Sequence, residues 1–393
     1  MKYTGLFAVA CVAIFSFSDA APLVNNNAGK PIPDSYIVVL KEGRNVSDFV
    51  PKFNDIARRQ NGRGRKPTIG HQFHTFRSFS ATVNAAALKE ILASEDVDFV
   101  EQDQIVSINT LQQSNPPSWG LRRVSQRQNN PSAPFYYQNQ AGAGVTAYVI
   151  DTGINTAHVE FGGRAVMGAN FVTGSANTDE NGHGTHVSGT IGGTTYGVAK
   201  RVNLVGVKVL NAQGQGSFSA IIAGMDWVAQ RARGTKAVVN MSLGGGKSQA
   251  LDQALTNLFY SGIPSIVAAG NDANADACNG SPSGAQGSFT VAASDIDDQM
   301  AYFSSYGQCV DIFGPGVNIL SSWIGSRTAT NTISGTSMAT PHVVGVAALL
   351  LSSDPSLTSP QAVYDKLHQT ATPNVIGGYL RGSPNKLVYN SAV

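Results

Sequence analysis

Charged side chains are scarce in this chain. They make up 13% of its 393 residues, and the formal net charge is +2. A surface that binds nucleic acid or an anionic membrane needs a concentration of positive charge. The composition therefore indicates neither a nucleic-acid partner nor binding to a charged membrane surface.

Long apolar runs are absent after the first twenty residues. No later stretch approaches the ~20 apolar residues that a membrane-spanning helix needs. Residues 1–20 combine Lys2, an apolar segment over 5–17 and small residues over 18–20. These features predict a signal peptide and hence a secreted, extracellular protein without a membrane partner. The alternative, a membrane anchor, is disfavoured because the apolar segment is short for a bilayer.

The first part of the remaining chain predicts a small domain of its own. Over residues 21–110, strand and helix patterns follow in the order β-α-β-β-α-β, with amphipathic helices over 46–60 and 85–95. This order suggests a ferredoxin-like α+β domain. His71 and His74 fall in its predicted hairpin, where ordinary surface-strand residues are a simpler interpretation than a metal pair or a pH switch. A polar, proline-containing stretch over 109–119 shows no pattern and predicts a linker at the domain boundary.

The rest of the chain, residues 111–393, predicts a larger α/β domain. Apolar strands alternate with helices, which is typical of a doubly wound, mostly parallel sheet covered by helices on both faces. The 42 glycines agree with a sheet protein that has many tight loops. Active sites in such sheets gather at the carboxyl ends of the strands.

One serine lies where a nucleophile is favoured. Ser337 sits in GTSMATPH, directly before the apolar run VVGVAALLL that predicts a buried helix. Pro341 is expected in the first turn of that helix, where its missing N–H breaks no bond. The free N–H groups and the positive dipole end of a helix start favour a developing negative charge at Ser337.

A hydroxyl is a weak nucleophile until a base takes its proton. His183 lies between two glycines in NGHGTHVSGTIGG, at a predicted helix start. Asp151 ends the β-rich run VTAYVID and can hold the imidazole in one tautomer. The chain order of the three residues is Asp, His, Ser, which is that of subtilisin and not that of chymotrypsin or the α/β-hydrolases.

Each motif alone has another interpretation. DTG at Asp151 also occurs in aspartic proteases, but those need a second copy, which this chain lacks. His183 and His186 have the spacing of a metal pair, yet no HExxH glutamate or further ligand cluster accompanies them, so His186 is predicted to be a helix-packing residue. The segment around Ser337 is close to the GxSxG of lipases, in which the aspartate and histidine follow the serine.

Together the motifs resemble those of the subtilases, and more closely those of the proteinase K family of secreted serine proteases. The matching segments are YVIDTGI, NGHGTHVSGTIGG, TYGVAK, GVKVL, IAGMDWV, SLGGG, VAAGN, IFGPG and SGTSMATPHVVG, in that order over nearly the whole chain. The resemblance implies a serine endopeptidase of broad specificity that forms an acyl-enzyme and needs no catalytic cofactor. A silent binding protein on this scaffold would lack a triad residue, and an esterase would not need peptide-binding glycines.

The resemblance also implies the residues around the triad. Asn271 matches the side-chain donor of the oxyanion hole, and the Ser337 N–H would be the second donor. Substrate binding falls to Gly214, Gln215, Gly216, Phe218, Ser242, Leu243, Gly244, Ala268 and Gly270. Turn geometry alone is the other explanation for these glycines. Because no charge is expected at its base, the pocket for the residue before the scissile bond should favour apolar or aromatic side chains.

Residues 21–110 resemble the inhibitory propeptide of this family. The resemblance implies a self-processed zymogen whose own propeptide is an intramolecular inhibitor, with the cut between about Asn109 and Gln113. The expected partners are protein and peptide substrates, and the expected state is a monomer.

A structural calcium ion is implied as well. The Asp311 carboxylate and the carbonyls of Gln286 and Ser288 match the family's strong site, and hard oxygen ligands suit this ion. The alternative is a solvated loop aspartate. The family's weaker site is expected to be absent, since residues 377–385 contain no acid.

Cysteine is rare, with three in the chain. Cys11 lies in the predicted signal peptide, and a Cys278–Cys309 disulfide is expected in an oxidising compartment, as family members carry a bridge in this segment. Two separate buried thiols remain the alternative. Asn279 begins a plausible glycosylation sequon, whereas the sequon at Asn240 lies in a predicted buried strand and should be unused.

Overall fold

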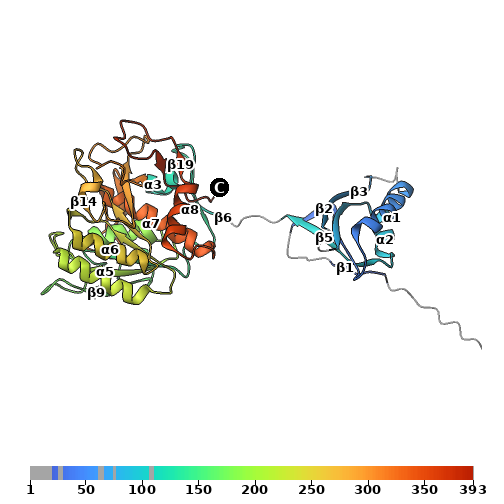
Figure 1. Cartoon of the computed structure of the whole chain (residues 1–393), viewed down its shortest axis with the longest axis horizontal. Coiled ribbons are helices and arrows are strands. Elements are labelled where there is room, and N and C mark those ends of the chain that lie inside the picture. Colours follow the sequence, from blue (N-terminus) through green and yellow to red (C-terminus); the bar gives the residue numbers. More distant parts are fainter. Residues whose placement is uncertain (1–19, 25–29, 61–65, 74–76, 106–109, 393) are drawn as a thin grey trace, which may run out of the picture. The chain divides into compact units, whose positions relative to one another are not determined.

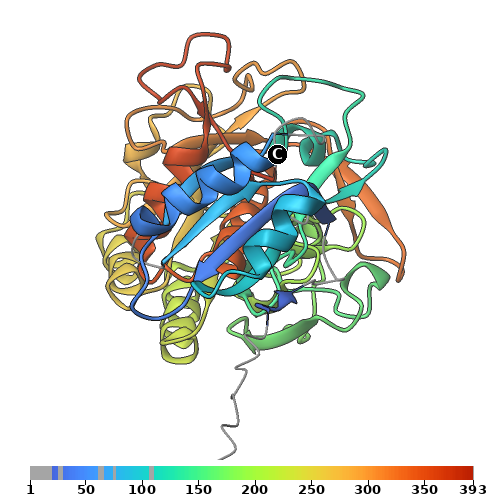
Figure 2. The same ribbon diagram turned by 90° about the vertical axis from the view of Figure 1, so that its right-hand side faces the viewer.

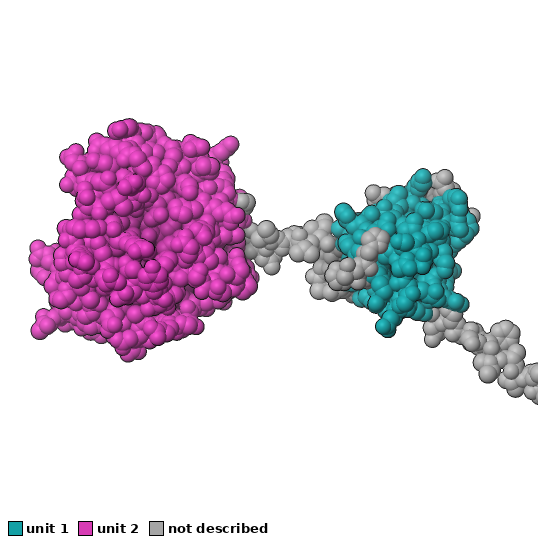
Figure 3. Space-filling model, viewed as in Figure 1, with its two compact units in different colours: residues 1–108 teal, residues 109–393 magenta. Residues whose placement is uncertain are grey.

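The structure is a computed structural model of the chain in which residues 20–24, 30–60, 66–73, 77–105 and 110–392 are described. The chain divides into two compact units, unit 1 over residues 1–108 and unit 2 over residues 109–393 (Figures 1 and 3). Residues 1–19 of the predicted signal peptide, and His74, lie outside the described residues.

Unit 1 is a mixed sheet with two helices against it (Figure 2). The strands lie in the order β1-β5-β2-β4-β3, and the helices are α1 (Val46–Arg59) and α2 (Ala85–Leu92). The strands are β1 (Leu23–Val24), β2 (Lys30–Leu40), β3 (Thr68–Phe73), β4 (Ser78–Thr82) and β5 (Val97–Ile105). Strand β1 pairs in parallel with β5. When β1 is left aside, the order of the elements along the chain and the order of the strands across the sheet are both those of the predicted ferredoxin-like domain.

The helices of unit 1 form where caps and apolar stripes favour them. The Asn45 side chain accepts from the Asp48 N–H, and that of Asn84 from the Ala87 N–H, so each asparagine satisfies a free donor at a helix start. Buried residues of α1 pack in one cluster with residues of β2 and β4. His71 lies exposed on β3, as an ordinary surface-strand residue.

Unit 2 is built on a nine-stranded sheet in the order β19-β20-β16-β15-β13-β11-β8-β10-β9. All neighbouring strands are parallel except β19 and β20. The bounds are β8 (Thr146–Asp151), β9 (Ala165–Asn170), β10 (Asn203–Lys208), β11 (Ala237–Met241), β13 (Ser265–Ala268), β15 (Ser288–Ser294), β16 (Ile312–Pro315), β19 (Thr372–Pro373) and β20 (Lys386–Leu387). The predicted doubly wound, mostly parallel sheet is confirmed.

Helices cover both faces of this sheet, and β8 shows why. Its Ala147 and Val149 belong to one buried cluster, while Tyr148 and Ile150 belong to another, because successive side chains of a strand point to opposite faces. The first cluster is covered by α3 (Trp119–Val124), α4 (His183–Gly192), α7 (Thr336–Ser353) and α8 (Pro360–Thr370), and the second by α5 (Phe218–Ala232) and α6 (Gln249–Tyr260).

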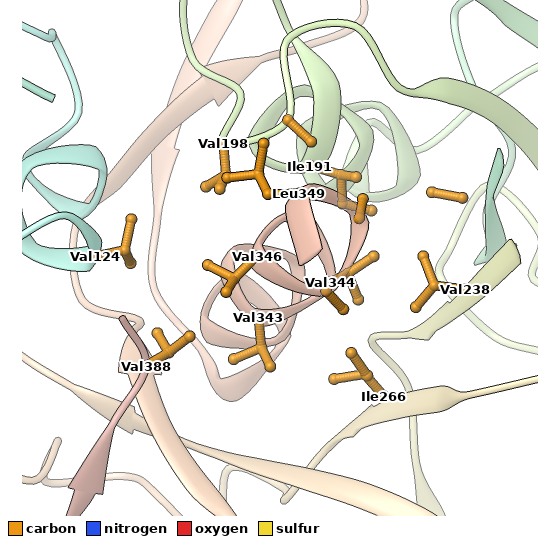
Figure 4. Packing of buried hydrophobic residues seen from close by; sticks show 14 of the residues in the cluster. Val124, Ile191, Val198, Val238, Ile266, Val343, Val344, Val346, Leu349 and Val388 are labelled. Carbon is orange, nitrogen blue, oxygen red and sulfur yellow. The ribbon is translucent and has the colours of Figure 1, made fainter. Parts of the chain in front are cut away.

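Helix α7 passes through the first cluster. In Figure 4 its Val344 lies among Ile191 of α4, Val238 of β11 and Ile266 of β13. Within the described part of the chain, α7 is the one helix long and apolar enough to cross a membrane. Since 83% of its apolar window is buried inside the protein, its composition reflects its place in the core.

Pro341 is not in the first turn of α7, so that prediction is wrong. The helix begins at Thr336, which puts Pro341 in the second turn. A proline there has no N–H to donate to the carbonyl four residues earlier, which is that of Ser337. The Ser242 hydroxyl donates to this carbonyl instead, at 2.8 Å. The proline thus creates a link between α7 and the segment after β11.

The prediction of a patternless linker over 109–119 is also wrong in part. Residues Thr110–Gln113 form β6, which pairs antiparallel with β7 (Phe135–Gln138) of unit 2. The Gln113 amide donates to the Thr195 carbonyl at 3.0 Å. A four-residue strand that includes two glutamines has too little apolar alternation to be recognised in a sequence.

The remaining ordered pairs are short. They are β12 (Gly245–Gly246) with β14 (Gly280–Ser281), and β17 (Ile319–Ser322) with β18 (Thr330–Ile333), beside the 3-10 turns η2 (Val159–Phe161) and η3 (Ala277–Asn279). Cys278 and Cys309 form a disulfide with an S–S distance of 2.10 Å, which confirms the expected bridge. Asn240 is buried in β11, whereas Asn279 is exposed.

Candidate active site

Asp151 and His183 form a hydrogen-bonded pair at the carboxyl end of the sheet. Asp151 ends β8 and is fully buried, while His183 begins α4 with 23% of its side chain exposed. His183 Nδ1 lies 2.8 Å from Asp151 Oδ1, which also accepts the Thr152 N–H at 2.7 Å. A carboxylate can only accept, so Nδ1 holds the proton and Nε2 is free to act as a base.

A second carboxylate, Asp179, organises the turn into α4. Its Oδ1 accepts the N–H groups of Asn181 (3.0 Å) and Gly182 (2.9 Å) and the Thr152 hydroxyl (2.8 Å). Its Oδ2 accepts the N–H (2.9 Å) and hydroxyl (2.6 Å) of Thr185. Asp179 therefore joins the first turn of α4 to the loop after β8. Its role was not predicted from the sequence, although an acid shortly before a helix start is a recognisable signal.

Both carboxylates act on the basicity of His183. Burial by itself would lower the pKa of His183, but the charge and hydrogen bond of Asp151, followed by the charge of Asp179, raise that pKa above its ordinary value. The neutral form that can accept a proton is therefore lost at a higher pH than for a free imidazole.

His186 is a packing residue, as the sequence predicts. It is fully buried in α4, its Nε2 lies 2.9 Å from the Ile319 carbonyl, and its ring meets that of Trp323 edge-on. Burial lowers the pKa of His186 to about 4, so the side chain is neutral near pH 7.

Ser337 is the second residue of α7 and is partly exposed. Its hydroxyl donates to the Ser242 carbonyl at 3.1 Å, and among the described residues no hydrogen bond joins it to His183. Ser337 and His183 line two neighbouring cavities that share Leu243, Gly244 and Gly245. Since catalytic hydrogen bonds are often long without substrate, the arrangement is compatible with transfer of the Ser337 proton to His183.

Two donors are available beside Ser337. Asn271 Oδ1 accepts both the N–H (2.8 Å) and the hydroxyl (2.9 Å) of Thr336, which fixes the orientation of its amide group. Within the described part of the chain, Asn271 Nδ2 donates to no residue, and the Ser337 N–H has no intrahelical acceptor at this position. Both residues line the same cavity, at the positive end of α7.

Every predicted substrate-binding residue lines one of the two cavities. The first cavity, of about 410 Å³, is lined by Leu243, Gly244, Ala268 and Gly270 together with Asn271 and Ser337. The second, of about 580 Å³, is lined by Gly214, Gln215, Gly216, Phe218, Ser242, Leu243 and Gly244 together with His183.

Two acidic residues belong to the lining of the first cavity. Asp272 and Asp276 line it. Asp276 is partly buried, and its carboxylate accepts the Cys278 N–H at 2.9 Å. The two acids belong to the loop that leaves the sheet after Asn271, and nothing in the local pattern shows that this loop folds back over the cavity.

Two further residues that the sequence analysis missed shape the second cavity. Lys208 is fully buried at the end of β10 and donates to the carbonyls of Thr152 (2.7 Å) and Leu210 (2.9 Å). The Asn211 side chain accepts the N–H groups of Gln213 and Gln215, both at 3.0 Å. These bonds fix the loop that carries the predicted glycines.

The three predicted calcium ligands line a separate cavity of about 280 Å³. Asp311 Oδ2 accepts the Thr290 N–H at 2.7 Å, and Oδ1 lies 3.4 Å from His368 Nε2. The described residues contain no group of three or more His, Cys, Asp or Glu side chains that could hold a metal. One carboxylate with carbonyls from Gln286 and Ser288 fits a hard cation that keeps several waters.

Comparison with known proteins identifies both parts of the chain. The family model described as "Subtilase family" matches residues 142–386, and the one described as "Peptidase inhibitor I9" matches residues 35–109. A "Cuticle-degrading serine protease" of Arthrobotrys oligospora is 42% identical over 98% of this chain and 97% of that protein. "Alkaline protease 1" of Emericella nidulans is 44% identical over 95% of this chain and 94% of that protein.

A solved structure agrees with these matches. The crystal structure of a cold adapted subtilisin-like serine proteinase superposes with a TM-score of 0.66 at 52% identity. It covers 69% of this chain and 97% of the other.

The fixed amide of Asn271 leads to the first prediction. Asn271→Ala should lower kcat for peptide hydrolysis by ~10²–10³, because one oxyanion donor is lost. KM should change little, since the hydrogen bond strengthens only as the oxyanion forms. Steady-state kinetics on a chromogenic peptide measure both constants. Asn274→Ala, on the same loop but outside the first cavity, serves as the control, and a loss confined to KM would contradict the assignment.

The second prediction concerns pH. With His183 as the expected general base, activity should fall as the pH drops through the raised pKa of that residue. Asp179→Asn removes one of the charges that raise this pKa, so the acid limb of kcat/KM should move to lower pH. A pH–rate profile measures its midpoint. Asp226→Asn, an equal charge change on the exposed face of α5, should leave the midpoint in place, and an unmoved midpoint in Asp179→Asn would refute the role.

Proposed function

We propose, from the premise that this chain belongs to the subtilase family of serine proteases, that it hydrolyses peptide bonds through Asp151, His183 and Ser337. The chain is a subtilisin-like serine protease with an inhibitor-type propeptide domain. The observation that carries the residue assignment is the Asp151–His183 hydrogen bond at a cavity that adjoins the cavity lined by Ser337, at the start of a buried helix.

In the first half of the reaction, Ser337 exchanges its hydrogen bond to the Ser242 carbonyl for one to His183 Nε2. As Oγ attacks the carbonyl carbon, its proton passes to Nε2, and Asp151 stabilises the imidazolium through Nδ1. The negative oxygen of the tetrahedral intermediate receives hydrogen bonds from the Ser337 N–H and from Asn271 Nδ2. His183 then gives its proton to the departing amine, and an ester on Ser337 remains.

In the second half, water replaces the amine. His183 takes a proton from the water as it attacks the ester, the same two donors hold the oxyanion, and the proton returns to Ser337 as the acid leaves. The net change is the addition of one water across one peptide bond. The chain's own residues supply every step, and no catalytic cofactor is required.

Substrate specificity is proposed to be broad. An extended peptide can pair its backbone with the segments Gly214–Gly216 and Ser242–Gly244, which line the second cavity. The side chain before the scissile bond enters the first cavity, whose apolar lining includes Leu243, Ala268 and Ala277. Apolar and aromatic side chains are favoured there, while Asp272 and Asp276 also admit basic ones.

The chain is proposed to be a secreted, monomeric zymogen. The apolar segment over 5–17 supports export, and the Cys278–Cys309 disulfide suits an oxidising compartment. Unit 1 acts as the intramolecular inhibitor of unit 2 until the chain is cut between about Asn109 and Gln113. Protein and peptide substrates are its other partners.

A structural calcium ion is proposed at Asp311, Gln286 and Ser288. The Asp311 carboxylate, directly before β16, and the carbonyls of Gln286 and Ser288, before and at the start of β15, would hold the ion, which would supply positive charge that offsets the carboxylate. No step of the reaction passes through the ion.

The test of the function is Ser337→Ala. This change should lower the catalytic rate by ~10⁶, leaving only binding and oxyanion contributions. It should also leave the precursor uncut when the protein is expressed alone. Casein hydrolysis and electrophoresis of the secreted protein measure the two effects. Wild-type protein that resists a serine-directed fluorophosphonate, or a mutant with a hundredth of wild-type activity, would contradict the proposal.

The test of the calcium site is thermal unfolding. Because the ion binds the folded form, calcium should raise the Tm of the inhibited wild-type enzyme in a concentration-dependent way. Asp311→Asn removes the only carboxylate among the proposed ligands and should abolish this dependence. Asp226→Asn is the matched control. Equal calcium dependence in Asp311→Asn and wild type would show that the ion binds elsewhere.

A further inference from the structure

One wall of the first cavity has few backbone hydrogen bonds in a strand ladder. Asn279, Gly280 and Ser283 line this side of the cavity, within the turn over residues 278–284. Strand β14 in this turn pairs with β12 through only two residues on each side, Gly245 with Ser281 and Gly246 with Gly280. Glycine is the residue that loses most conformational freedom on folding, so this short ladder is weak by itself.

Two other hydrogen bonds hold this turn: the Ser281 hydroxyl accepts the Ser248 N–H at 2.9 Å, and the Ser283 carbonyl accepts the Thr290 hydroxyl at 2.8 Å. Lys247, directly after β12, adds a charged contact to them. Its ammonium lies 2.9 Å from the Gly284 carbonyl, 3.1 Å from that of Cys278 and 3.4 Å from that of Gly280. It also lies 3.0 Å from Asp252 Oδ2 in the first turn of α6. Four oxygens from two separate parts of the chain thus surround one positive charge, which is the kind of ligand set that a bound metal cation has in other proteins.

The Lys247 ammonium offsets the electrostatic repulsion between the three carbonyl oxygens and the Asp252 carboxylate. The three carbonyls point their negative ends to one place, and the Asp252 carboxylate, with 16% of its side chain exposed, faces them. Within the described residues the other oxygen of Asp252, Oδ1, is buried without a partner. Without a cation these oxygens repel one another, which weakens the contact between α6 and the turn over 278–284.

Such a weakening would loosen the wall but not detach it. The disulfide from Cys278 to Cys309 anchors the start of the same turn independently. The polar partners of the Lys247 ammonium in the described structure do not include a triad residue. The proposed oxyanion donor Asn271 is fixed by Thr336. Loss of the ammonium should therefore affect the binding of large side chains in the first cavity and spare the chemical step.

We infer that Lys247 is a positioning residue that acts as a built-in cation: its ammonium fixes the wall of the first cavity, and a small cation can take its place when it is removed. This inference rests on the proposed function of the first cavity as the site for the side chain before the scissile bond.

The experiment uses Lys247→Met in the mature enzyme and two peptides that differ only in Phe or Ala before the scissile bond. Selectivity, the ratio of kcat/KM for the Phe peptide to that for the Ala peptide, should fall about 10-fold, mainly through KM. Added potassium or ammonium should restore it at constant ionic strength, whereas tetramethylammonium, which is too large for the site, should not.

Two further variants keep the test decisive. Lys200→Met removes an ammonium that also meets three carbonyls, those of Thr194, Thr195 and Gly197, but lines neither cavity. It should leave selectivity unchanged. Asp252→Asn retains Lys247 and the side-chain volume but removes the negative charge that ties the ammonium to α6. It should therefore lower selectivity in the same direction, so the role can be tested even if Lys247→Met does not fold.

The outcomes separate this inference from the proposed function. Wild-type enzyme that cleaves neither peptide contradicts the function itself. Wild-type activity with unchanged selectivity in Lys247→Met, or in Asp252→Asn where the first variant does not fold, overturns the inference alone. A loss of selectivity that no small cation restores also overturns it, because the side chain would then act by its packing and not by its charge.

Discussion

The position of Ser337 depends on the burial of α7. Apolar side chains cover this helix on all sides, from α4 and α3 to the strands of the central sheet, so it cannot shift or rotate without opening the core. The core thus fixes the first turn of α7, and with it the Ser337 N–H, the Thr336 groups that hold Asn271, and the carbonyl that receives the Ser242 hydroxyl. A site of a few hydrogen bonds obtains its rigidity from a large apolar cluster.

Besides the apolar packing, two carboxylates fix the loops around His183. Asp151 and Asp179 meet at Thr152, whose N–H bonds to the first and whose hydroxyl bonds to the second. The end of β8 and the start of α4 are thereby joined through two buried carboxylates, and His183, the first residue of α4, is hydrogen-bonded to Asp151. Both carboxylates raise the pKa of the His183 imidazole.

The sequence predicts the elements whose signal is local and periodic. The buried parallel strands, the helix after Ser337 and the amphipathic helices of unit 1 are of this kind, and the triad motifs end or begin such elements. Other elements have no local, periodic signal: the polar strand β6, the edge strand β9 and the glycine pair β12–β14. Their pairing depends on partners far away in the chain. The same reason hides Asp179, Lys247 and the acids of the first cavity, whose roles arise only when loops fold onto one another. The second-turn position of Pro341 was missed because helix ends are weakly marked.

The central helix of the core is also one of the last segments of the chain. Residues that pack around α7 in β8 and α4 occur some 150 to 200 positions earlier in the sequence. During synthesis from the N-terminus, this apolar cluster lacks its central helix until nearly the whole chain has emerged. The strands cannot complete their packing earlier, because their contacts with α7 join residues that are far apart in the sequence. Because Ser337, the proposed nucleophile, lies in the first turn of the helix that closes the cluster, the chain acquires its folded core and this serine's position in the same event. An incomplete or unfolded copy has no nucleophile in place to cut its neighbours.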